Sequence, residues 1–228
     1  TSLTLSIVLS VATLAVLLAY VAVDRMASLL AIVIVVLDKA FVDYSTSGLE
    51  NPLTHFLLIV FFALVFHSAR TTRDLARLSL VAGLAVLNRF DILLLVAPPL
   101  LFVAFKLRHH RWRVIVAMLP ALAPFVLWEI FAVVFYGFPL PNTYYAKLST
   151  GVSRIEQLHQ GLLYILQSVD TDPLTVAVIL VGLVLPWLRR DRFLISVTIG
   201  ILLYLLYIVN IGGDFMMGRF LTAPFLCA

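Results

Sequence analysis

Residues 193–220 read FLISVTIGILLYLLYIV up to position 209 and then NIGGDFMMGRF. The first part is an apolar run close to the roughly 20 residues that a transmembrane helix needs. The second part places Asp214, Arg219 and three glycines, Gly212, Gly213 and Gly218, at the end of that run. Charge beside hydrocarbon is costly and marks functional sites, and glycine lets a backbone come close to a ligand. The stretch therefore predicts a membrane helix followed by a binding or catalytic loop, although a tight turn between helices would explain it too.

The composition extends this interpretation to the whole chain. Hydrophobic residues make up 63% of the sequence and charged residues 12%, with a mean hydropathy of +1.10, whereas about a quarter of a soluble domain is charged. We therefore expect an all-α integral membrane protein, a polytopic helical bundle with short and broken spans. The single cysteine, Cys227, excludes an internal disulfide framework. The net charge of +4 is interpreted as a signal of topology, and no nucleic-acid partner is expected.

The two ends of the sequence suggest a piece of a longer protein. The chain begins at Thr1 without a methionine and stops at Ala228, a few residues into a new apolar run. We expect residues 1–228 to form one transmembrane domain. An upstream span with its outer loop, and any C-terminal soluble domain, would lie outside this sequence.

Apolar runs predict where the spans lie. They are residues 3–23, 26–42, 53–66, 76–87, 92–105, 114–136, 174–188 and 193–209, and a last run starts near residue 220. The runs 76–87 and 92–105 are short, and they flank a polar turn at 88–91. Residues 155–168 are amphipathic, so we expect them to lie at the membrane interface or to re-enter the membrane.

Basic residues orient the bundle, because Lys and Arg collect in cytoplasmic loops. If alternate connections face one side, eleven of the sixteen Lys and Arg residues fall there. These are Arg25, Arg70, Arg73, Arg77, Lys106, Arg108, Arg111, Arg113, Arg189, Arg190 and Arg192. The other side holds Lys39, Arg89, Lys147, Arg154 and Arg219. We assign the first side to the cytoplasm, which requires separate helices before and after Arg89.

The polar motifs then gather on the outer side. They are residues 43–52, 88–91, 139–147 and 212–219. Basic, featureless loops inside and glycine-bearing loops outside indicate an active or binding face toward the exterior.

Asn51 and Pro52 are typical of an N-cap and the first residue of a helix. A helix N-terminus attracts anions through its free N–H groups, and Ser47 adds a hydroxyl beside it. A well-capped helix without a ligand explains the same motif. Asp172 and Pro173 repeat the start signal with no chemistry around it, and we expect only a cap there.

Cations and carboxylates recur together in the outer loops. Two loops hold one of each: Arg89 with Asp91, and Arg219 with Asp214. Each pair either fixes a turn or belongs to a site. Lys39 and Asp43 lie four residues apart, so mutual pairing on one helix face is their simplest interpretation.

Aromatic residues crowd the outer end of the span 114–136 and the loop after it. They are Tyr136, Phe138, Tyr144 and Tyr145. An aromatic belt at the membrane interface explains them, and the alternative is a surface that stacks sugar rings or a groove for a lipid tail. The sequence has no glycine-rich nucleotide loop, no His-Glu-x-x-His and no cysteine pair, so we expect no cofactor and no metal.

Four of these motifs together resemble a known family. In chain order they are Thr46-Ser47-Gly48-Leu49-Glu50-Asn51, the Arg89/Asp91 turn, Pro141-Asn142-Thr143-Tyr144-Tyr145-Ala146-Lys147 and Gly212-Gly213-Asp214-Phe215-Met216-Met217-Gly218-Arg219. They are similar to the membrane part of the GT-C glycosyltransferases related to the mycobacterial terminal β-(1→2) arabinofuranosyltransferase. The resemblance covers most of the chain from about residue 43. The turn reads Arg-Phe-Asp where relatives often have Arg-Pro-Glu or Arg-Pro-Asp.

The resemblance implies an enzyme of the outer face of the plasma membrane. Such enzymes pass a sugar from a polyprenyl-phosphate donor to a glycan acceptor, within the lipid bilayer and without a nucleotide. The departing lipid phosphate needs cations and N–H donors. The candidates for that role are Arg89, Lys147, Arg219, Asn51 and Ser47, and the candidates for sugar or acceptor contacts are Asn142, Tyr144 and Tyr145.

The resemblance leaves the general base open. A carboxylate must take the proton of the acceptor hydroxyl, and the candidates here are Asp43, Glu50 and Asp214. The family's usual catalytic carboxylates lie in the first outer loop, upstream of this sequence.

Two other functional classes fit parts of the pattern. A transporter or flippase of lipid-linked substrates would also have broken helices and charges within the membrane, but here the charged motifs lie at one face and no internal repeat is present. A non-catalytic membrane scaffold would not need so many polar outer motifs. An acidic pair soon after a span upstream of residue 1 would favour the enzyme.

Overall fold

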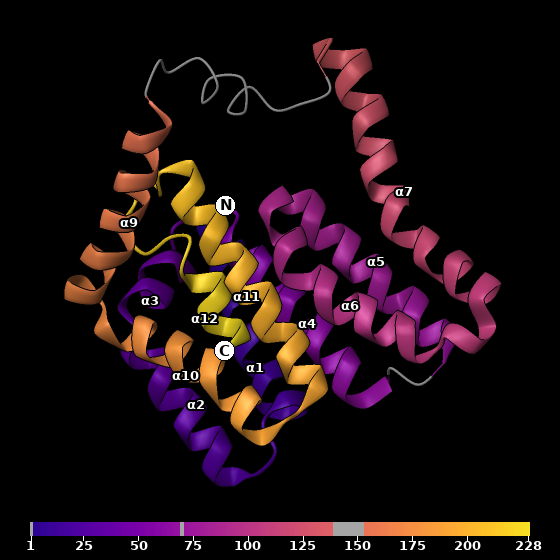
Figure 1. Ribbon diagram of the computed structural model, residues 1–228, viewed down its shortest axis with the longest axis horizontal. Coiled ribbons are helices and arrows are strands. Elements are labelled where there is room, and N and C mark those ends of the chain that lie inside the picture. Colours follow the sequence, from indigo (N-terminus) through magenta and orange to yellow (C-terminus); the bar gives the residue numbers. More distant parts are fainter. Residues whose placement is uncertain (1, 69–70, 139–152) are drawn as a thin grey trace.

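The computed structural model describes residues 2–68, 71–138 and 153–228. All regular elements of these residues are helices, so the expected all-α class is confirmed. Figure 1 shows them as a bundle, with the upper part of one long helix, α7, standing clear of it.

The helices keep the order expected from the apolar runs. They are α1 (Ser2–Val16), continued by the π-helical turn Leu17–Val21, α2 (Arg25–Leu37), α3 (Lys39–Ser45), α4 (Asn51–Ser68), α5 (Thr72–Asn88), the 3-10 turn Phe90–Ile92, α6 (Leu93–Lys106), the 3-10 turn Arg108–His110, α7 (Arg111–Tyr136), α9 (Arg154–Thr171), α10 (Pro173–Arg189), α11 (Arg192–Ile211) and α12 (Thr222–Cys227).

Three continuous helical segments in the described part are long and apolar enough to cross a membrane. They are Ser2–Val21, Arg111–Tyr136 and Arg192–Ile211. The α9–α10 pair also qualifies by composition but is bent by 112°, and α2 and α4 are shorter apolar helices. The chain is thus a multi-pass membrane protein with broken spans.

Aspartates start two of the helices. The predicted single span 26–42 is wrong, because Asp38 is extended (φ −73°, ψ 110°) and separates α2 from α3. Its carboxylate accepts a hydrogen bond from the Phe41 N–H at 2.6 Å and so starts a new helix. Asp172 starts α10 in the same way, through the Thr175 N–H at 3.3 Å, as its sequence predicted.

The turn between α5 and α6 also follows the sequence. Arg89 is extended (φ −151°, ψ 118°), so residues 76–105 form two short helices and not one long one. Asn88 ties this turn to the start of α4, because its Nδ2 donates to the Glu50 carbonyl at 3.1 Å and to Thr54 Oγ1 at 2.8 Å.

Helix α11 lies between α6 and α9 and makes close backbone contacts with both. A Cβ added to Gly200 would lie 2.8 Å from the Leu95 carbonyl oxygen, and one added to Gly161 would lie 2.3 Å from that of Val209. Small residues allow such approaches between membrane helices. This packing brings the end of α9 to the loop that follows α11.

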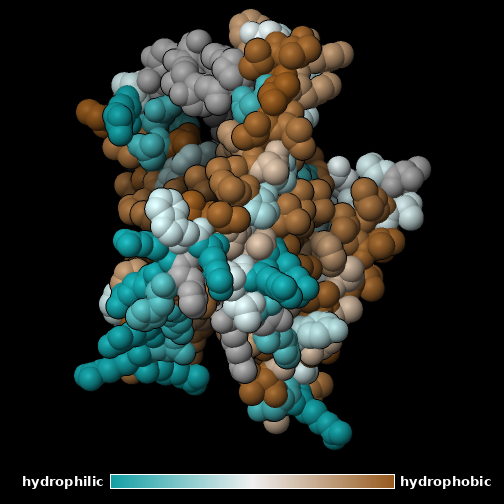
Figure 2. Space-filling model, turned by 90° about the vertical axis from the view of Figure 1, so that its right-hand side faces the viewer, coloured by the Kyte–Doolittle hydropathy of each residue, from teal (hydrophilic) through white to brown (hydrophobic). Residues whose placement is uncertain are grey.

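The basic connections share one edge of the bundle. Figure 1 places the α1–α2, α6–α7 and α10–α11 connections in the lower half of the view, with the α5–α6 turn and the end of α11 toward the top. Figure 2 shows hydrophilic residues gathered at that lower end, below a largely hydrophobic surface. The alternation of basic and glycine-bearing connections is therefore a property of the fold.

Candidate functional site

Arg219 lies between two carboxylates from distant parts of the chain. Its Nη2 is 2.6 Å from Glu50 Oε1, and its Nη1 is 3.2 Å from Asp214 Oδ2. Glu50 directly precedes α4, and Asp214 follows α11. The guanidinium therefore joins two of the motif loops.

Arg89 is the second arginine near the Glu50 carboxylate. Its Nε donates to Asp91 Oδ1 at 3.1 Å and its Nη2 to the Tyr204 hydroxyl at 2.9 Å. The same hydroxyl donates to Asp91 Oδ2 at 2.7 Å, and Arg89 Nη1 lies 3.8 Å from Glu50 Oε1. Burial opposes the charge of Arg89, but Tyr204, Asp91 and Glu50 raise its pKa above the ordinary value, so it stays a cation.

These residues form one arginine–carboxylate cluster, which consists of Glu50, Arg89, Asp91, Asp214 and Arg219. Both ion pairs expected from the loops are present, and the Glu50 carboxylate faces the two guanidinium groups at once. With two cations and three carboxylates, the ionised cluster carries a net charge of −1. Most of its positive charge is therefore already paired.

Two donors of the cluster have no hydrogen-bond partner among the described residues. They are Arg89 Nη1 and Arg219 Nε, and their side chains are only 7% and 21% exposed. A buried donor without a partner costs about 1–3 kcal/mol. An oxygen of an anionic ligand would recover that cost at these two atoms.

Asn51 supports Arg219 from behind. Its Nδ2 donates to the Arg219 carbonyl at 3.2 Å and to Thr222 Oγ1 at 3.1 Å. The predicted N-cap role of Asn51 is wrong, since α4 begins at Asn51 and the Glu50 carbonyl accepts its first hydrogen bond, from the Thr54 N–H. The Asn51 side chain instead donates to the Arg219 carbonyl, which also accepts a hydrogen bond from the Thr222 hydroxyl at 3.0 Å.

Two tyrosines shape the loop 212–219. The Tyr44 hydroxyl donates to the Met217 carbonyl at 2.9 Å, and the Tyr164 hydroxyl to that of Met216 at 3.4 Å. Gly213 has φ 73°, and a Cβ on it would lie 2.7 Å from the Cβ of Tyr164. Glycine is required there both by its backbone conformation and by its packing.

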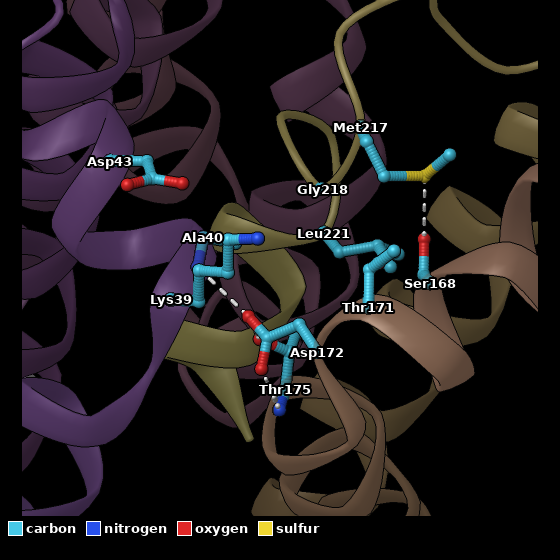
Figure 3. Close-up of a pocket in the computed structure, with 10 residues that line it drawn as sticks. All are labelled: Lys39, Ala40, Asp43, Ser168, Thr171, Asp172, Thr175, Met217, Gly218 and Leu221. Atoms are coloured by element: carbon cyan, nitrogen blue, oxygen red, sulfur yellow. Dashed lines mark hydrogen bonds between the residues drawn. The ribbon is translucent and has the colours of Figure 1, made fainter.

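A polar cavity of about 120 Å³ lies on the other side of this loop, between α3 and the α9–α10 corner (Figure 3). The residues drawn there include Lys39, Asp43, Thr171, Asp172, Met217 and Gly218. Asp172 forms its base, because its Oδ2 accepts the Ala40 N–H at 2.8 Å and the Thr175 hydroxyl at 2.8 Å. The Thr175 hydroxyl also contacts Asp38, so this network joins α3 to α10.

The predicted pairing of Lys39 with Asp43 is wrong. Within the described ranges neither side chain forms a hydrogen bond or an ion pair. Both are exposed at the mouth of the cavity, where water solvates each charge and an ion pair would gain little.

An apolar groove of about 590 Å³ runs between α5, α6 and α7. Val86, Leu93, Leu100, Met118 and Phe125 are among its lining residues. Val86 and Leu93 flank the turn that carries Arg89. The groove therefore ends close to the cluster.

The structure thus brings together only part of the predicted site. Glu50, Arg89, Asp214 and Arg219 meet, with Asn51 beside them. Asp43 lies at the cavity instead, and the Ser47 hydroxyl stays in its own turn, donating to the Tyr44 carbonyl at 3.0 Å. Lys147, Asn142, Tyr144 and Tyr145 lie outside the described residues.

Sequence reasoning missed several residues around the cluster. Tyr204 lies in an apolar run and Tyr164 in the amphipathic segment 155–168. The sequence indication of a role for either residue was its hydroxyl group, which needs a hydrogen-bond partner when it is buried. His55 is fully buried one helical turn after Asn51, stacks on Phe41 at 4.9 Å between ring centroids, and has no hydrogen-bond partner among the described residues. The position of this histidine within an apolar run was the sequence indication of a role for it.

Comparison with known proteins identifies a relative of this chain. The chain is 30% identical over 218 aligned residues to the terminal beta-(1->2)-arabinofuranosyltransferase of Mycobacterium tuberculosis. This chain is a sequence relative of that arabinofuranosyltransferase. The match covers 81% of the chain, which spans only about a third (34%) of the length of the relative. No protein-family model and no solved structure matches.

The resemblance expected from the four motifs is therefore confirmed at the level of the family relationship.

Proposed function

We propose that the protein is a membrane glycosyltransferase, which moves a sugar from a polyprenyl-phosphate donor to a cell-envelope glycan at the outer face of the plasma membrane. The name of its relative suggests arabinofuranose as the sugar. The observation that carries the proposal is the meeting of the buried Arg89 and the partly buried Arg219, from separate motif loops, around one carboxylate.

The two arginines suit a departing phosphate. Cleavage of the bond between the anomeric carbon and the phosphate oxygen leaves the electron pair on the lipid phosphate, and fixed cations stabilise that charge. A guanidinium binds phosphate oxygens in pairs through its planar fork. Arg89 Nη1 and Arg219 Nε are the unpaired donors available for this role, and we propose Lys147 as a further cation.

The apolar groove suits the lipid part of the donor. Its walls are made of α5, α6 and α7, and one end lies beside the turn of Arg89. A prenyl chain lying there would bring its phosphate toward the cluster, because headgroup and tail are covalently joined.

The acceptor hydroxyl must lose a proton as its oxygen attacks the anomeric carbon. Glu50 and Asp214 both form ion pairs with Arg219, so either carboxylate would have to give up that contact to reach an acceptor hydroxyl. Asp43 has no such partner among the described residues and is the better candidate of the three. A base outside this sequence would make Asp43 a contact of the acceptor.

Purified full-length protein in lipid nanodiscs tests the proposal. With a radiolabelled prenyl-phosphoryl arabinofuranose and an arabinose oligosaccharide, we expect label in the oligosaccharide. Glu50→Gln should reduce this transfer, whereas Arg192→Ala should not, because Arg192 is the first residue of α11 and the cluster lies beyond the last. Label that crosses proteoliposome membranes without entering the glycan would instead indicate a transporter, and neither transfer nor transport would contradict the proposal.

A further inference from the structure

We propose that the cavity between α3, the α9–α10 corner and the loop 212–219 is a subsite for one sugar ring. This inference rests on the proposed function and adds to it a place and a set of contacts. Lys39, Asp43 and Thr171 would hold the hydroxyl groups of the ring. The cavity is shown in Figure 3.

The size of the cavity suits a single ring. Its volume of about 120 Å³ is close to the ~150 Å³ of an engineered cavity that holds one benzene molecule. A ring of five or six atoms with hydroxyl groups reaching the open mouth would therefore fill it. A second ring would have to lie outside.

The chemistry of the walls suits hydroxyl groups. Asp43 accepts hydrogen bonds and Lys39 donates them, and neither is engaged with another described side chain. Both project from one face of α3, a helical turn apart. The Thr171 hydroxyl donates to the Gln167 carbonyl at 3.0 Å, so its oxygen remains an acceptor.

The opposite wall is apolar and shaped by a glycine. Met217 and Leu221 line it, and an apolar surface is what the C–H face of a sugar ring needs. Gly218 has φ 78°, and a Cβ there would lie 2.9 Å from the Cβ of Ala40. The loop can therefore approach α3 closely enough to close the cavity on that side.

The charges of the cavity favour a neutral ligand over a phosphate. One cation, Lys39, and two carboxylates, Asp43 and Asp172, line the cavity, and a third carboxylate, Asp38, contacts Thr175 beside Asp172. A phosphate would meet a single exposed lysine here, whereas the cluster offers two guanidinium groups with unused donors. A metal site is not favoured either, because the described residues contain no group of three His, Cys, Asp or Glu side chains placed to hold a metal ion.

The position of the cavity connects it to the cluster. The loop 212–219 contributes Met217 and Gly218 to the cavity, and Asp214 and Arg219 to the cluster. Tyr44, the residue after Asp43, contacts this loop, since its hydroxyl group donates to the Met217 carbonyl at 2.9 Å. A ring in the cavity and a phosphate at the arginines would thus lie on two sides of one loop.

A binding experiment without turnover tests the subsite first. In full-length protein with Cys227→Ser, Thr171→Cys is reacted with a charged methanethiosulfonate reagent, with and without a methyl arabinofuranoside disaccharide. We expect the sugar to slow modification several-fold, and mannitol, an open-chain polyol, to have no effect. Asp170→Cys, an exposed neighbour that does not line the cavity, should react at the same rate in all cases. Absence of protection, or equal protection by Mg²⁺ or Ca²⁺ alone, would overturn the subsite.

Steady-state kinetics then identify which sugar occupies it. Asp43→Asn and Lys39→Met each lose a hydrogen bond to a charged group and should raise one KM about tenfold, and Thr171→Phe should raise it further by blocking the mouth. A higher KM for the oligosaccharide assigns the subsite to the acceptor, and a higher KM for the prenyl-phosphoryl sugar assigns it to the donor. Asp170→Asn serves as the control. Unchanged KM values in folded variants would refute the subsite but not the proposed transferase activity. Protection of Thr171→Cys by the sugar without any sugar transfer would refute the proposed reaction but not the subsite.

Discussion

Arg219 uses two of its three nitrogens for carboxylates and keeps Nε without a partner among the described residues. Arg89 likewise keeps Nη1 free of hydrogen bonds within that part of the chain. Each arginine thus combines a structural contact with an unused donor. This division explains why the ion pairs and a phosphate site are compatible interpretations of the same residues.

Substitution of Arg219 separates the two roles. Arg219→Lys keeps the charge but loses the planar fork, so we expect kcat/KM for transfer to fall roughly tenfold to a hundredfold, and Arg219→Ala to lower it more. The measurement is sugar transfer by the full-length protein.

The double variant Arg219→Ala with Asp214→Ala is the control for this prediction. It removes Asp214, one of the two carboxylates that lose Arg219 as a partner, so stability should recover in part while transfer stays low. Full activity in the double variant would show that Arg219 only neutralises Asp214.

Tyr204→Phe should weaken the fold through the Arg89 turn. The change removes the hydroxyl that bridges Arg89 and Asp91 in a fully buried position, and leaves a charged group short of one partner. We expect the free energy of unfolding to fall by about 1–3 kcal/mol, measured by thermal unfolding in detergent. Tyr207→Phe is the matched control, because Tyr207 lies one turn further along α11 and its hydroxyl group has no hydrogen bond to the described residues. An equal effect of both changes would contradict this role.

At the scale of elements, carboxylates decide where the helices break. Asp38 and Asp172 each cap a helix, and they meet at the Thr175 hydroxyl. The start of α10 at Asp172-Pro173 was predictable, because proline is favoured at the first position of a helix. The break at Asp38 was not, because its carboxylate is stabilised by Thr175, a partner far away in the sequence.

The approach of α9 to α11 is predicted to depend on Gly161. In Gly161→Ala the added methyl group would meet the Val209 carbonyl, so α9 must move away. We expect a loss of about 1–3 kcal/mol in unfolding free energy from overpacking, together with lower transfer activity, because Tyr164 of α9 holds the loop 212–219. Gln160→Ala, an exposed neighbour, should behave as the wild type. Equal stability of the two variants would argue against the close contact.

At the scale of the whole molecule, the basic connections lie at one edge of the bundle. The arginine–carboxylate cluster lies between helices from both halves of the chain. Loops 46–50, 89–91 and 212–219 converge because the start of α4 lies beside the ends of α5 and α11. A site built this way can hold a substrate between elements that are far apart in the sequence.

The topology prediction is tested by labelling. In intact cells expressing a Cys227→Ser background, cysteine at Ser47 or Ser149 should react with an impermeant reagent added outside, and cysteine at Arg111 should react only after permeabilisation. The physical reason is the excess of Lys and Arg in the connections assigned to the cytoplasm. The reverse pattern would place the cluster inside the cell and overturn the proposed location.

The sequence by itself determined the class of the protein, most of its helix positions, the two Arg–Asp pairs and the family resemblance. Each of these depends on neighbouring residues: the length of an apolar run, a Pro after an Asp, or opposite charges in one short loop. Tertiary structure alone decided that Glu50 faces both arginines, that Asn51 serves Arg219 and not its own helix, and that Asp43 and Lys39 stay unpaired beside a cavity. A carboxylate or an amide has several possible partners of similar strength, and only the packing of α4, α9 and α11 determines which of them comes within hydrogen-bonding distance.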